Sequence, residues 1–201
     1  MEKGPKHDAL EKIRSEVVAL KKSPLYEYRQ KNGYQPVIGE GNSDARIMLI
    51  GEAPGKREAE TGRPFCGAAG KLLDQMLAAN GIERQSVYTT NIVKDRPPEN
   101  RDPTPAEIAL YAPFLTRQID IIKPKVLAAL GRFSYAYVMR AFGLESLIEP
   151  IGKARGKTFE AQASYGKVVI FPLYHPAAAL YNQRLKSTLS ADFNTLANFE
   201  K

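Results

Sequence analysis

The stretch RIMLIGEAPG, residues 46–55, places four consecutive apolar side chains, Ile47 to Ile50, directly before a turn with two glycines and a proline. A short apolar run bounded by turn residues is typical of a strand that is buried on both faces of a sheet. Glycines at the end of such a strand allow a ligand to approach the backbone closely. The stretch therefore predicts a strand of a parallel sheet, with the carboxylate of Glu52 at its carboxyl end.

Strands and helices are predicted to alternate along the rest of the chain. Further strands are expected at 86–93, at 125–131 and in the second arm of a hairpin over 156–175. Helices are expected at 8–22, 71–81, 104–124, 132–142 and 186–200, and an irregular connector at 23–45. This alternation predicts an α/β fold of three layers, αβα, with a central four-stranded, mainly parallel sheet in one domain over residues 1–201.

The helix expected at 104–124 has clear signals at its start and an interruption inside it. Thr104 is expected to cap the helix, with Pro105 at the first helical position and Glu107 completing a capping box. Pro113 lacks a backbone N–H group, so it is expected to divide the helix into two pieces.

The composition is that of an ordinary globular protein, with 43% hydrophobic and 25% charged residues in 201. No apolar run approaches the roughly 20 residues of a membrane span. The charged N-terminal stretch lacks the apolar centre of a signal peptide, so a cytoplasmic protein is expected. The net charge of +7 favours a polyanionic partner; the alternative is a solvated surface with extra lysine.

Cysteine and histidine are scarce: Cys66 is the one cysteine, and His7 and His175 are the two histidines. One cysteine excludes a disulfide within the chain. A structural zinc site or a cysteine-held iron–sulfur cluster needs about four such ligands, so no metal site is expected.

Four segments with unusual chemistry follow the carboxyl ends of the predicted strands, where parallel sheets open into a ligand-binding crevice. They are GEAPG (51–55), NIVKDRPPENR (91–101), LGRFS (130–134) and YHPAAAL (174–180). The first matches neither a Walker loop nor a dinucleotide-binding motif. The candidate chemistry of the chain is therefore expected at this edge of the sheet.

Four side chains are the candidates for that chemistry. Glu52 can orient or deprotonate a water molecule, and Phe65, in GRPFCGAAG (62–70), can stack on a planar base. Asn91 has a donor and an acceptor that match the O4/N3–H edge of uracil, and His175 can donate to a carbonyl oxygen that gains negative charge. Each has a structural alternative: a solvated turn glutamate, a core phenylalanine, an asparagine bonded to its own backbone and a packed histidine.

Basic residues accompany these candidates. Lys94, Arg96 and Arg101 lie in a proline-stiffened loop that is expected to face phosphates. Ala178, Leu180, Tyr181 and Arg184 follow His175, and they are expected to wedge into a nucleic-acid groove and to hold a phosphate.

Taken together, these motifs resemble those of the uracil-DNA glycosylase superfamily, most closely its family 4, the thermostable bacterial and archaeal type. The resemblance runs from about residue 20 to 185, and the motifs occur in the family's order: GEGN (40–43), GEAPG (51–55), GRPFCGAAG (62–70), TNIVKDRPPENR (90–101), PFLTRQI (113–119), KVLAALG (125–131), KARGK (153–157) and HPAAAL (175–180). It implies a monomeric DNA-repair enzyme that flips uracil out of DNA and hydrolyses its N-glycosidic bond, leaving an abasic site and free uracil. It also places Arg155, in KARGK, at the DNA.

The resemblance assigns catalysis to Glu52, in the water-activating motif, and to His175, which would stabilise the uracil anion at O2. Phe65 would stack on the flipped uracil, Asn91 would read its Watson–Crick edge, and Glu58 would help to crowd out the methyl group of thymine. The substrate-binding residues implied in this way are Ala53, Glu58, Phe65 and Asn91.

The chain departs from family 4 at one group of positions. That family carries four cysteines that hold a structural 4Fe–4S cluster, and by motif the corresponding residues here are Leu20, Ser23, Asp95 and Tyr111. The resemblance therefore implies the fold and the pocket but no cluster and no other cofactor. In place of the cluster, Leu20 is expected to pack against Tyr111, with Ser23 and Asp95 in polar contact.

Three other functions remain open from the sequence. A glycosylase for another deaminated base, hypoxanthine or xanthine, would be distinguished by competition with the free bases. A DNA-binding derivative without catalysis would not need Glu52, Asn91 and His175 together. A flavodoxin-like nucleotide-binding enzyme shares the fold class, but the sequence has no recognisable phosphate loop for it.

Overall fold

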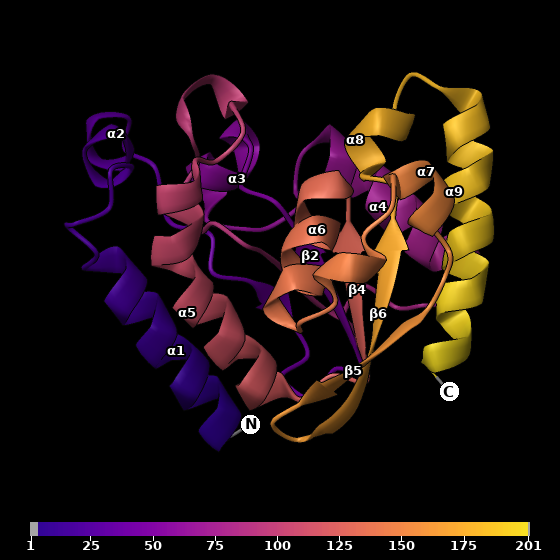
Figure 1. Ribbon diagram of the computed structural model, residues 1–201. Helices are drawn as coiled ribbons and strands as arrows, with labels where there is room; N and C mark the ends of the chain where they lie inside the picture. The colour runs from indigo at the N-terminus through magenta and orange to yellow at the C-terminus, as the bar shows by residue number, and fades with distance from the viewer. Residues whose placement is uncertain (1–3, 201) are drawn as a thin grey trace.

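The computed structural model describes residues 4–200 and has a six-stranded sheet at its centre (Figure 1). In spatial order the strands are β1 (Glu40–Gly41), β3 (Tyr88–Asn91), β2 (Ile47–Gly51), β4 (Val126–Leu130), β6 (Gly166–Leu173) and β5 (Phe159–Ala163). The four central strands are parallel, whereas β1 and β5 pair antiparallel at the two edges. The predicted α/β class and mainly parallel sheet are confirmed.

The predicted number of four strands is wrong, because each edge of the sheet carries one more. β5 is the first arm of the predicted hairpin, and it pairs with β6 from Phe159 opposite Ile170 to Ala163 opposite Gly166. β1 has two residues, too few to show an alternating pattern in the sequence, and pairs with β3. Both additions extend the sheet without changing its parallel centre.

The helices connect the strands in the order that the sequence predicts, with some additions. They are α1 (Pro5–Val18), α2 (Tyr26–Lys31), α3 (Lys56–Thr61), α4 (Ala68–Ala79), α5 (Pro105–Ile122), α6 (Arg132–Ala141), α7 (Ile151–Ala154), α8 (Pro176–Ala179) and α9 (Gln183–Leu196), with short 3-10 helices at Pro98–Asn100, Glu145–Leu147 and Ala197–Phe199. The connector expected to be irregular contains α2, a helix of six residues.

Pro113 does not divide α5, in contrast to the prediction. The proline lies on the exposed face of the helix, while the neighbouring Phe114 and Leu115 are buried in the core. The predicted capping box between Thr104 and Glu107 is present at the start of the helix. Burial of one long apolar face of α5 offsets the free-energy cost of the hydrogen bond that the proline cannot make.

Two hydrophobic clusters cover the two faces of the sheet and make the molecule three-layered. Along β2, Met48 and Ile50 face the cluster under α1, α5 and α6, whereas Ile47 and Leu49 face the cluster under α4 and α9. Alternate residues of a strand point to opposite faces, so an apolar run is what this double burial requires. In Figure 1, α5 and α6 lie on one side of the sheet and α4 on the other.

The order in which successive strands join the sheet reverses at β2. From β2 the chain passes to β3 on one side of the sheet, and β4 then pairs with β2 on the other side. In open parallel sheets, such a switch leaves a crevice at the carboxyl ends of the strands, and Glu52 and Gly131 follow β2 and β4 there. Within residues 4–200, no helix has both the length and the apolar character that crossing a membrane demands.

Candidate active site

A cavity of about 460 Å³ opens at the carboxyl ends of the parallel strands. We call it the main cavity. The loop after β2 forms one wall, the loop leading into α4 forms a second, and residues 97 and 100–102 form a third. Among its lining residues are Glu52, Ala53, Glu58, Phe65, Asn91, Arg101 and His175. The structure thus brings together all six residues predicted for catalysis and substrate binding.

Gly51 packs against two lining residues of this cavity, Asn91 and Phe65, and a side chain at position 51 would collide with both. A Cβ atom at position 51 would lie 2.3 Å from Asn91 Oδ1 and 2.8 Å from Phe65 Cζ. Gly51 and Asn91 are direct partners in the β2–β3 register, so the amide stands beside the glycine at the strand ends. The absence of a side chain at Gly51 therefore lets the Asn91 amide and the Phe65 ring, which both line the main cavity, approach the end of β2 closely.

Phe65 is held in an unusual backbone conformation. Its φ angle is 51°, in the left-handed region that residues other than glycine seldom adopt. Gly70, in the first turn of α4, permits this geometry, since a Cβ atom there would lie 1.6 Å from the carbonyl oxygen of Phe65. The ring is 8% exposed, and its centroid lies 5.7 Å from that of His175. Main-chain packing therefore sets the orientation of the ring.

His175 is held as a neutral imidazole with its proton on a defined nitrogen. Its Nδ1 accepts a hydrogen bond from the backbone N–H of Ala177 at 3.1 Å, so the ring proton lies on Nε2. Burial lowers the pKa of His175 to about 4, although the nearby Glu58 carboxylate acts in the opposite direction. Part of the ring remains accessible from the main cavity. It is therefore a neutral N–H donor over a wide pH range.

Glu52 is half-buried at the end of β2. Burial raises the pKa of its carboxyl group to about 7; the Asp102 carboxylate adds to this rise, and the Arg132 guanidinium opposes it. The backbone carbonyl of Glu52 accepts the N–H of Val93 at 3.0 Å, which fixes the turn. A carboxylate with a pKa near neutrality is suited to accept a proton from water.

Glu58 joins two turns beside the main cavity. Its Oε1 accepts the N–H of Gly67 at 2.8 Å. Its Oε2 fills the space that a side chain on Gly55 would occupy, 2.7 Å from the position of such a Cβ atom. The carboxylate thus ties the start of α4 to the start of α3 and narrows the cavity next to Ala53.

Lys94 is completely buried, so the prediction that it faces phosphates is wrong. Its Nζ donates to Thr90 Oγ1 at 2.8 Å, to the carbonyl of Asn91 at 2.6 Å and to Gln118 Oε1 at 2.6 Å. Burial holds the pKa of Lys94 well below its ordinary value, while the three acceptors match the donors of an ammonium group. The side chain therefore fixes the end of β3 directly behind Asn91.

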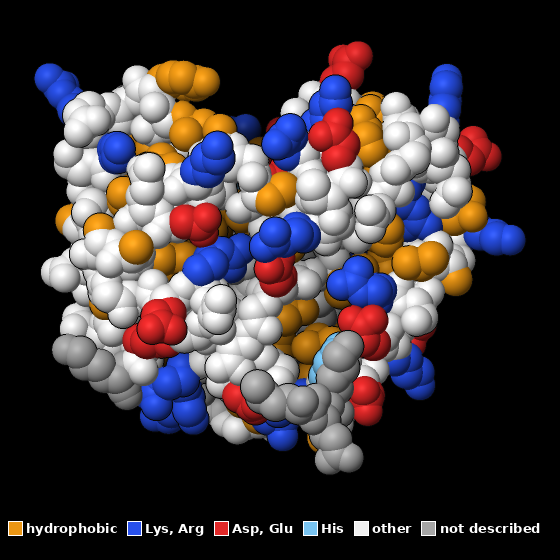
Figure 2. Space-filling view, turned by 180° about the vertical axis from the view of Figure 1, so that it is seen from behind, with side chains coloured by type: hydrophobic (Ala, Val, Ile, Leu, Met, Phe, Trp, Pro, Cys, Tyr) orange, Lys and Arg blue, Asp and Glu red, His pale blue; other side chains and the backbone are white. Residues whose placement is uncertain are grey.

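Two of the arginines predicted at the DNA are engaged within the protein. Arg96 donates to Tyr34 Oη at 2.9 Å, and Arg155 donates through Nε to Oδ2 of the buried Asp192 at 2.6 Å. Both arginines are half-buried. In Figure 2, Lys and Arg side chains are spread over the back of the molecule among acidic ones and do not form one basic patch on that face.

Of the remaining predicted DNA contacts, one lies at the main cavity, and the other two, Leu180 and Arg184, lie at the end of α8 and in the first turn of α9. Arg101 lines the cavity and pairs with the buried carboxylate of Glu107 at 2.6 Å, and Arg184 is exposed in the first turn of α9. Leu180 packs in part against the core, whereas the next side chain, Tyr181, is 97% exposed. Tyr181 is therefore the side chain of this loop that projects furthest into solvent.

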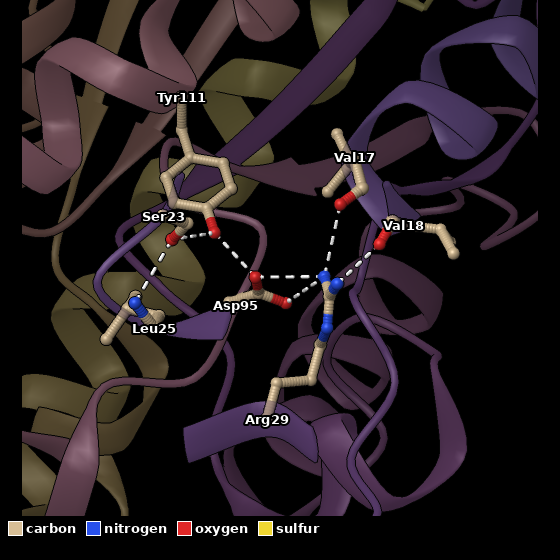
Figure 3. Close-up of polar contacts among 7 residues, drawn as sticks. All are labelled: Val17, Val18, Ser23, Leu25, Arg29, Asp95 and Tyr111. Carbon is tan, nitrogen blue, oxygen red and sulfur yellow. Dashed lines mark hydrogen bonds and ion pairs between the residues drawn. The ribbon is translucent and has the colours of Figure 1, made fainter. Parts of the chain in front are cut away.

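A buried polar network includes three of the four positions that correspond to the cluster cysteines of family 4, Ser23, Asp95 and Tyr111 (Figure 3). Tyr111 Oη is 2.8 Å from Ser23 Oγ and donates to Asp95 Oδ2 at 2.5 Å. Arg29 Nη1 donates to both carboxylate oxygens of Asp95, at 3.1 and 3.0 Å, and the guanidinium also donates to two carbonyls at the end of α1. Ser23 and Asp95 are therefore linked through the tyrosine, and Leu20 packs against the core cluster that contains Tyr111.

Metal-binding side chains do not gather anywhere in the described part of the chain. Within residues 4–200, no three His, Cys, Asp or Glu side chains form a group that could hold a metal ion. Cys66 is partly exposed and lies within hydrogen-bond distance of Thr61 Oγ1, at 3.2 Å.

Several residues that shape the site were not predicted from the sequence. Asp102, in a loop, and Arg132, the first residue of α6, influence Glu52 from distant parts of the chain, and Arg29 pairs with a residue 66 positions away. Gly70 supports Phe65 across the turn into α4. Only Gly70 carried a local signal, because it ends the glycine- and alanine-rich stretch before the helix.

Comparison with known proteins gives matches over most of the chain. A family model described as the uracil DNA glycosylase superfamily matches residues 38–197. A type-4 uracil-DNA glycosylase of Sulfurisphaera tokodaii is 47% identical over 190 residues, which are 94% of this chain and 84% of that protein. Type-4 uracil-DNA glycosylases of Archaeoglobus fulgidus and Thermotoga maritima are 41% and 42% identical, over 94% and 82% of this chain and 92% and 83% of theirs.

Proposed function

The chain belongs to the uracil-DNA glycosylase superfamily, and from that membership we propose how its residues remove uracil from DNA. The enzyme is a uracil-DNA glycosylase, a hydrolase that acts in DNA repair on uracil-containing DNA. The observation that carries the residue assignment is the convergence of the Asn91 amide, the Phe65 ring and the His175 imidazole on the main cavity.

In this proposal the uracil nucleotide is flipped out of the DNA into the main cavity, a step that costs a few kcal/mol and is cheapest for a mispaired base. Phe65 stacks on the ring of uracil, and the Asn91 amide pairs with its O4/N3–H edge. Glu58 and Ala53 narrow the cavity next to the base, which supports a role in excluding the methyl group of thymine.

The N-glycosidic bond then breaks, and negative charge accumulates on the departing uracil. The neutral His175 donates its Nε2–H to the O2 atom, where that charge develops; a donor placed in this way is worth roughly 2.7–4 kcal/mol of barrier. Glu52 holds a water molecule and takes its proton as the water adds to the sugar, so that free uracil and an abasic site result. Arg101, Arg184 and the exposed Tyr181 contact the DNA around the cavity.

We propose that the enzyme works without a 4Fe–4S cluster. The four positions that carry the cluster's cysteines in family 4 hold a leucine, a serine, an aspartate and a tyrosine, none of which offers a thiolate. Three of these side chains are already linked by hydrogen bonds to one another, and Asp95 is paired with Arg29. The residues present therefore do not fit the cluster. A monomeric enzyme is part of the proposal, since the proposed site residues all come from one chain. A single domain and a cytoplasmic location are proposed with it.

The proposed function predicts uracil release without any metal. The purified protein, analysed for iron and kept in EDTA, is incubated with oligonucleotides that contain one uracil, one hypoxanthine or one xanthine, and alkali then cleaves abasic sites. We expect cleavage at uracil by protein that contains no stoichiometric iron. An intact uracil strand at stoichiometric enzyme would contradict the function, and cleavage only at hypoxanthine or xanthine would assign a different deaminated base.

The raised pKa of Glu52 predicts the pH dependence of the reaction. The base must be ionised to accept a proton, so kcat/KM is expected to rise with pH through about 7. His175, with a pKa of about 4, is neutral throughout this range. Asp102→Asn removes a charge that raises the pKa of Glu52, so the increase in kcat/KM is expected at lower pH. Arg132→Gln removes a charge that lowers this pKa, so the increase in kcat/KM is expected at higher pH. Steady-state kinetics from pH 5 to 9 measure both shifts; shifts in the same direction would contradict the role of Glu52.

A further inference from the structure

A second cavity, of about 430 Å³, adjoins the main cavity. The two share Glu52, His175 and Ala177, so these residues form a partition between them. The second cavity lies outside the carboxyl ends of β4 and β6, between the start of α6 and the α8–α9 region. It is almost as large as the cavity assigned to the flipped uracil, and the catalytic mechanism leaves it without a role.

Most of the lining of the second cavity away from the shared partition is apolar or aromatic. It includes Leu130, Phe133, Ile151, Tyr174 and Leu185. A phosphate would gain little from such walls, whereas a nucleobase offers a flat apolar face that stacks on an aromatic ring. The chemistry of the inner surface therefore favours a base over the sugar–phosphate backbone.

A positively charged side chain, that of Arg132, lies at the rim of the second cavity. Arg132, the first residue of α6, keeps 72% of its side chain exposed, and its guanidinium carbon lies 4.5 Å from the centroid of the Phe133 ring. Its contact with Asp102 is long, 3.9 Å, and both partners are exposed, so the pair is weak. Arg132 is therefore available to a phosphate at the mouth while Phe133 faces the cavity.

We propose that the second cavity binds the base of a nucleotide adjacent to the target uracil in an unpaired strand. This inference rests on the proposed function, because a strand whose uracil fills the main cavity must continue past the shared partition. The neighbouring base enters beside Phe133, and the phosphate between the two nucleotides lies near Arg132. The enzyme then holds two consecutive bases, on either side of Glu52 and His175, and single-stranded DNA presents both without the cost of breaking base pairs.

The experiment removes the neighbouring base and keeps the backbone. Three single-stranded oligonucleotides carry one uracil: one is complete, one has a tetrahydrofuran abasic residue on the 5′ side of the uracil, and one has it on the 3′ side. A stacked base contributes about 1–3 kcal/mol of binding free energy. Since 1.4 kcal/mol corresponds to a tenfold change in affinity, its loss weakens binding about 5- to 150-fold. We expect kcat/KM to fall by this factor on one of the two abasic strands, mainly through KM.

Two variants locate the effect in the second cavity. Phe133→Ala is expected to turn over the complete strand and the sensitive abasic strand at the same rate. Ala178→Phe fills the second cavity from an exposed position on its rim, without disturbing the core. This variant is also expected to turn over the complete strand and the sensitive abasic strand at the same rate. Phe142→Ala is the matched control, since it removes a ring at the opposite end of α6 and should leave the difference between the strands intact.

The outcomes separate this inference from the proposed function. Equal rates of wild-type enzyme on all three strands would overturn the second cavity as a base site while the glycosylase activity stands. A difference that persists in both Phe133→Ala and Ala178→Phe would overturn it too, because the sensitivity would lie elsewhere. No uracil release from any strand would overturn the proposed function and the inference with it.

Discussion

Asn91→Ala is expected to lower kcat/KM for uracil release by about 10⁴-fold, the scale at which a site built for hydrogen bonding loses a substrate whose polar groups are left unpaired. Asn91 is 2% exposed, stands against Gly51 and lines the main cavity. Its removal leaves the O4/N3–H edge of a bound uracil without its partner in the protein. Affinity for uracil-free DNA is expected to remain unchanged, because the buried amide contacts only the flipped base in the proposed mechanism.

Single-turnover kinetics and a fluorescence-anisotropy titration with uracil-free DNA measure the two quantities separately. Asn80→Ala is the matched control: the Asn80 side chain donates to the carbonyl of Met76 at the end of α4, outside the main cavity, and its loss should leave kcat/KM near the wild-type value. Wild-type turnover by Asn91→Ala would show that another residue reads the base. A parallel loss of affinity for uracil-free DNA would indicate a damaged fold.

Asp95→Ala is expected to lower the free energy of unfolding by about 3–5 kcal/mol, the cost of removing one partner from a buried ion pair. Arg29 and Asp95 are 3% and 1% exposed, so the guanidinium would keep a buried charge without its carboxylate. Tyr111 would also lose the acceptor of its hydroxyl group. The network joins α1, the α1–α2 connector, α2, the loop after β3 and α5, so its loss is expected to weaken the contacts among these elements.

Urea denaturation followed by circular dichroism measures this change. The matched control is Glu40→Ala, which breaks the exposed pair of Glu40 with Arg63, a bidentate contact at the surface. An exposed pair of this kind contributes about 0–1 kcal/mol. Equal losses in the two variants would contradict the assignment of the Asp95 network as the element that replaces a cluster.

The parallel centre of the fold was predictable because its signal is local. Each central strand is short, largely apolar or β-branched, and bounded by turn residues, and burial on both faces requires that composition. The site followed from the same reasoning, since Glu52, Asn91 and His175 come directly at or after strand ends that parallel pairing brings to one edge. The two-residue β1 gave no comparable signal.

Which basic residues are buried and paired inside the protein was not predictable, because this depends on partners that are distant in sequence. Lys94 stands in a polar, proline-rich stretch that is typical of an exposed loop, yet Gln118 of α5, 24 residues later, completes its buried site. Arg155 meets Asp192 across 37 residues. Local sequence shows that a charge is present, but only the tertiary structure shows which charges are neutralised inside the protein.

The bonds among Ser23, Tyr111, Asp95 and Arg29 have a consequence for how the protein matures. This junction consists of the polypeptide's own oxygen and nitrogen atoms, so it can close as soon as the chain collapses. In the enzyme proposed here, which holds no cluster, a host cell needs no iron supply and no sulfide donor to complete this junction. Air, peroxide or a chelating buffer then finds no inorganic centre to attack during purification.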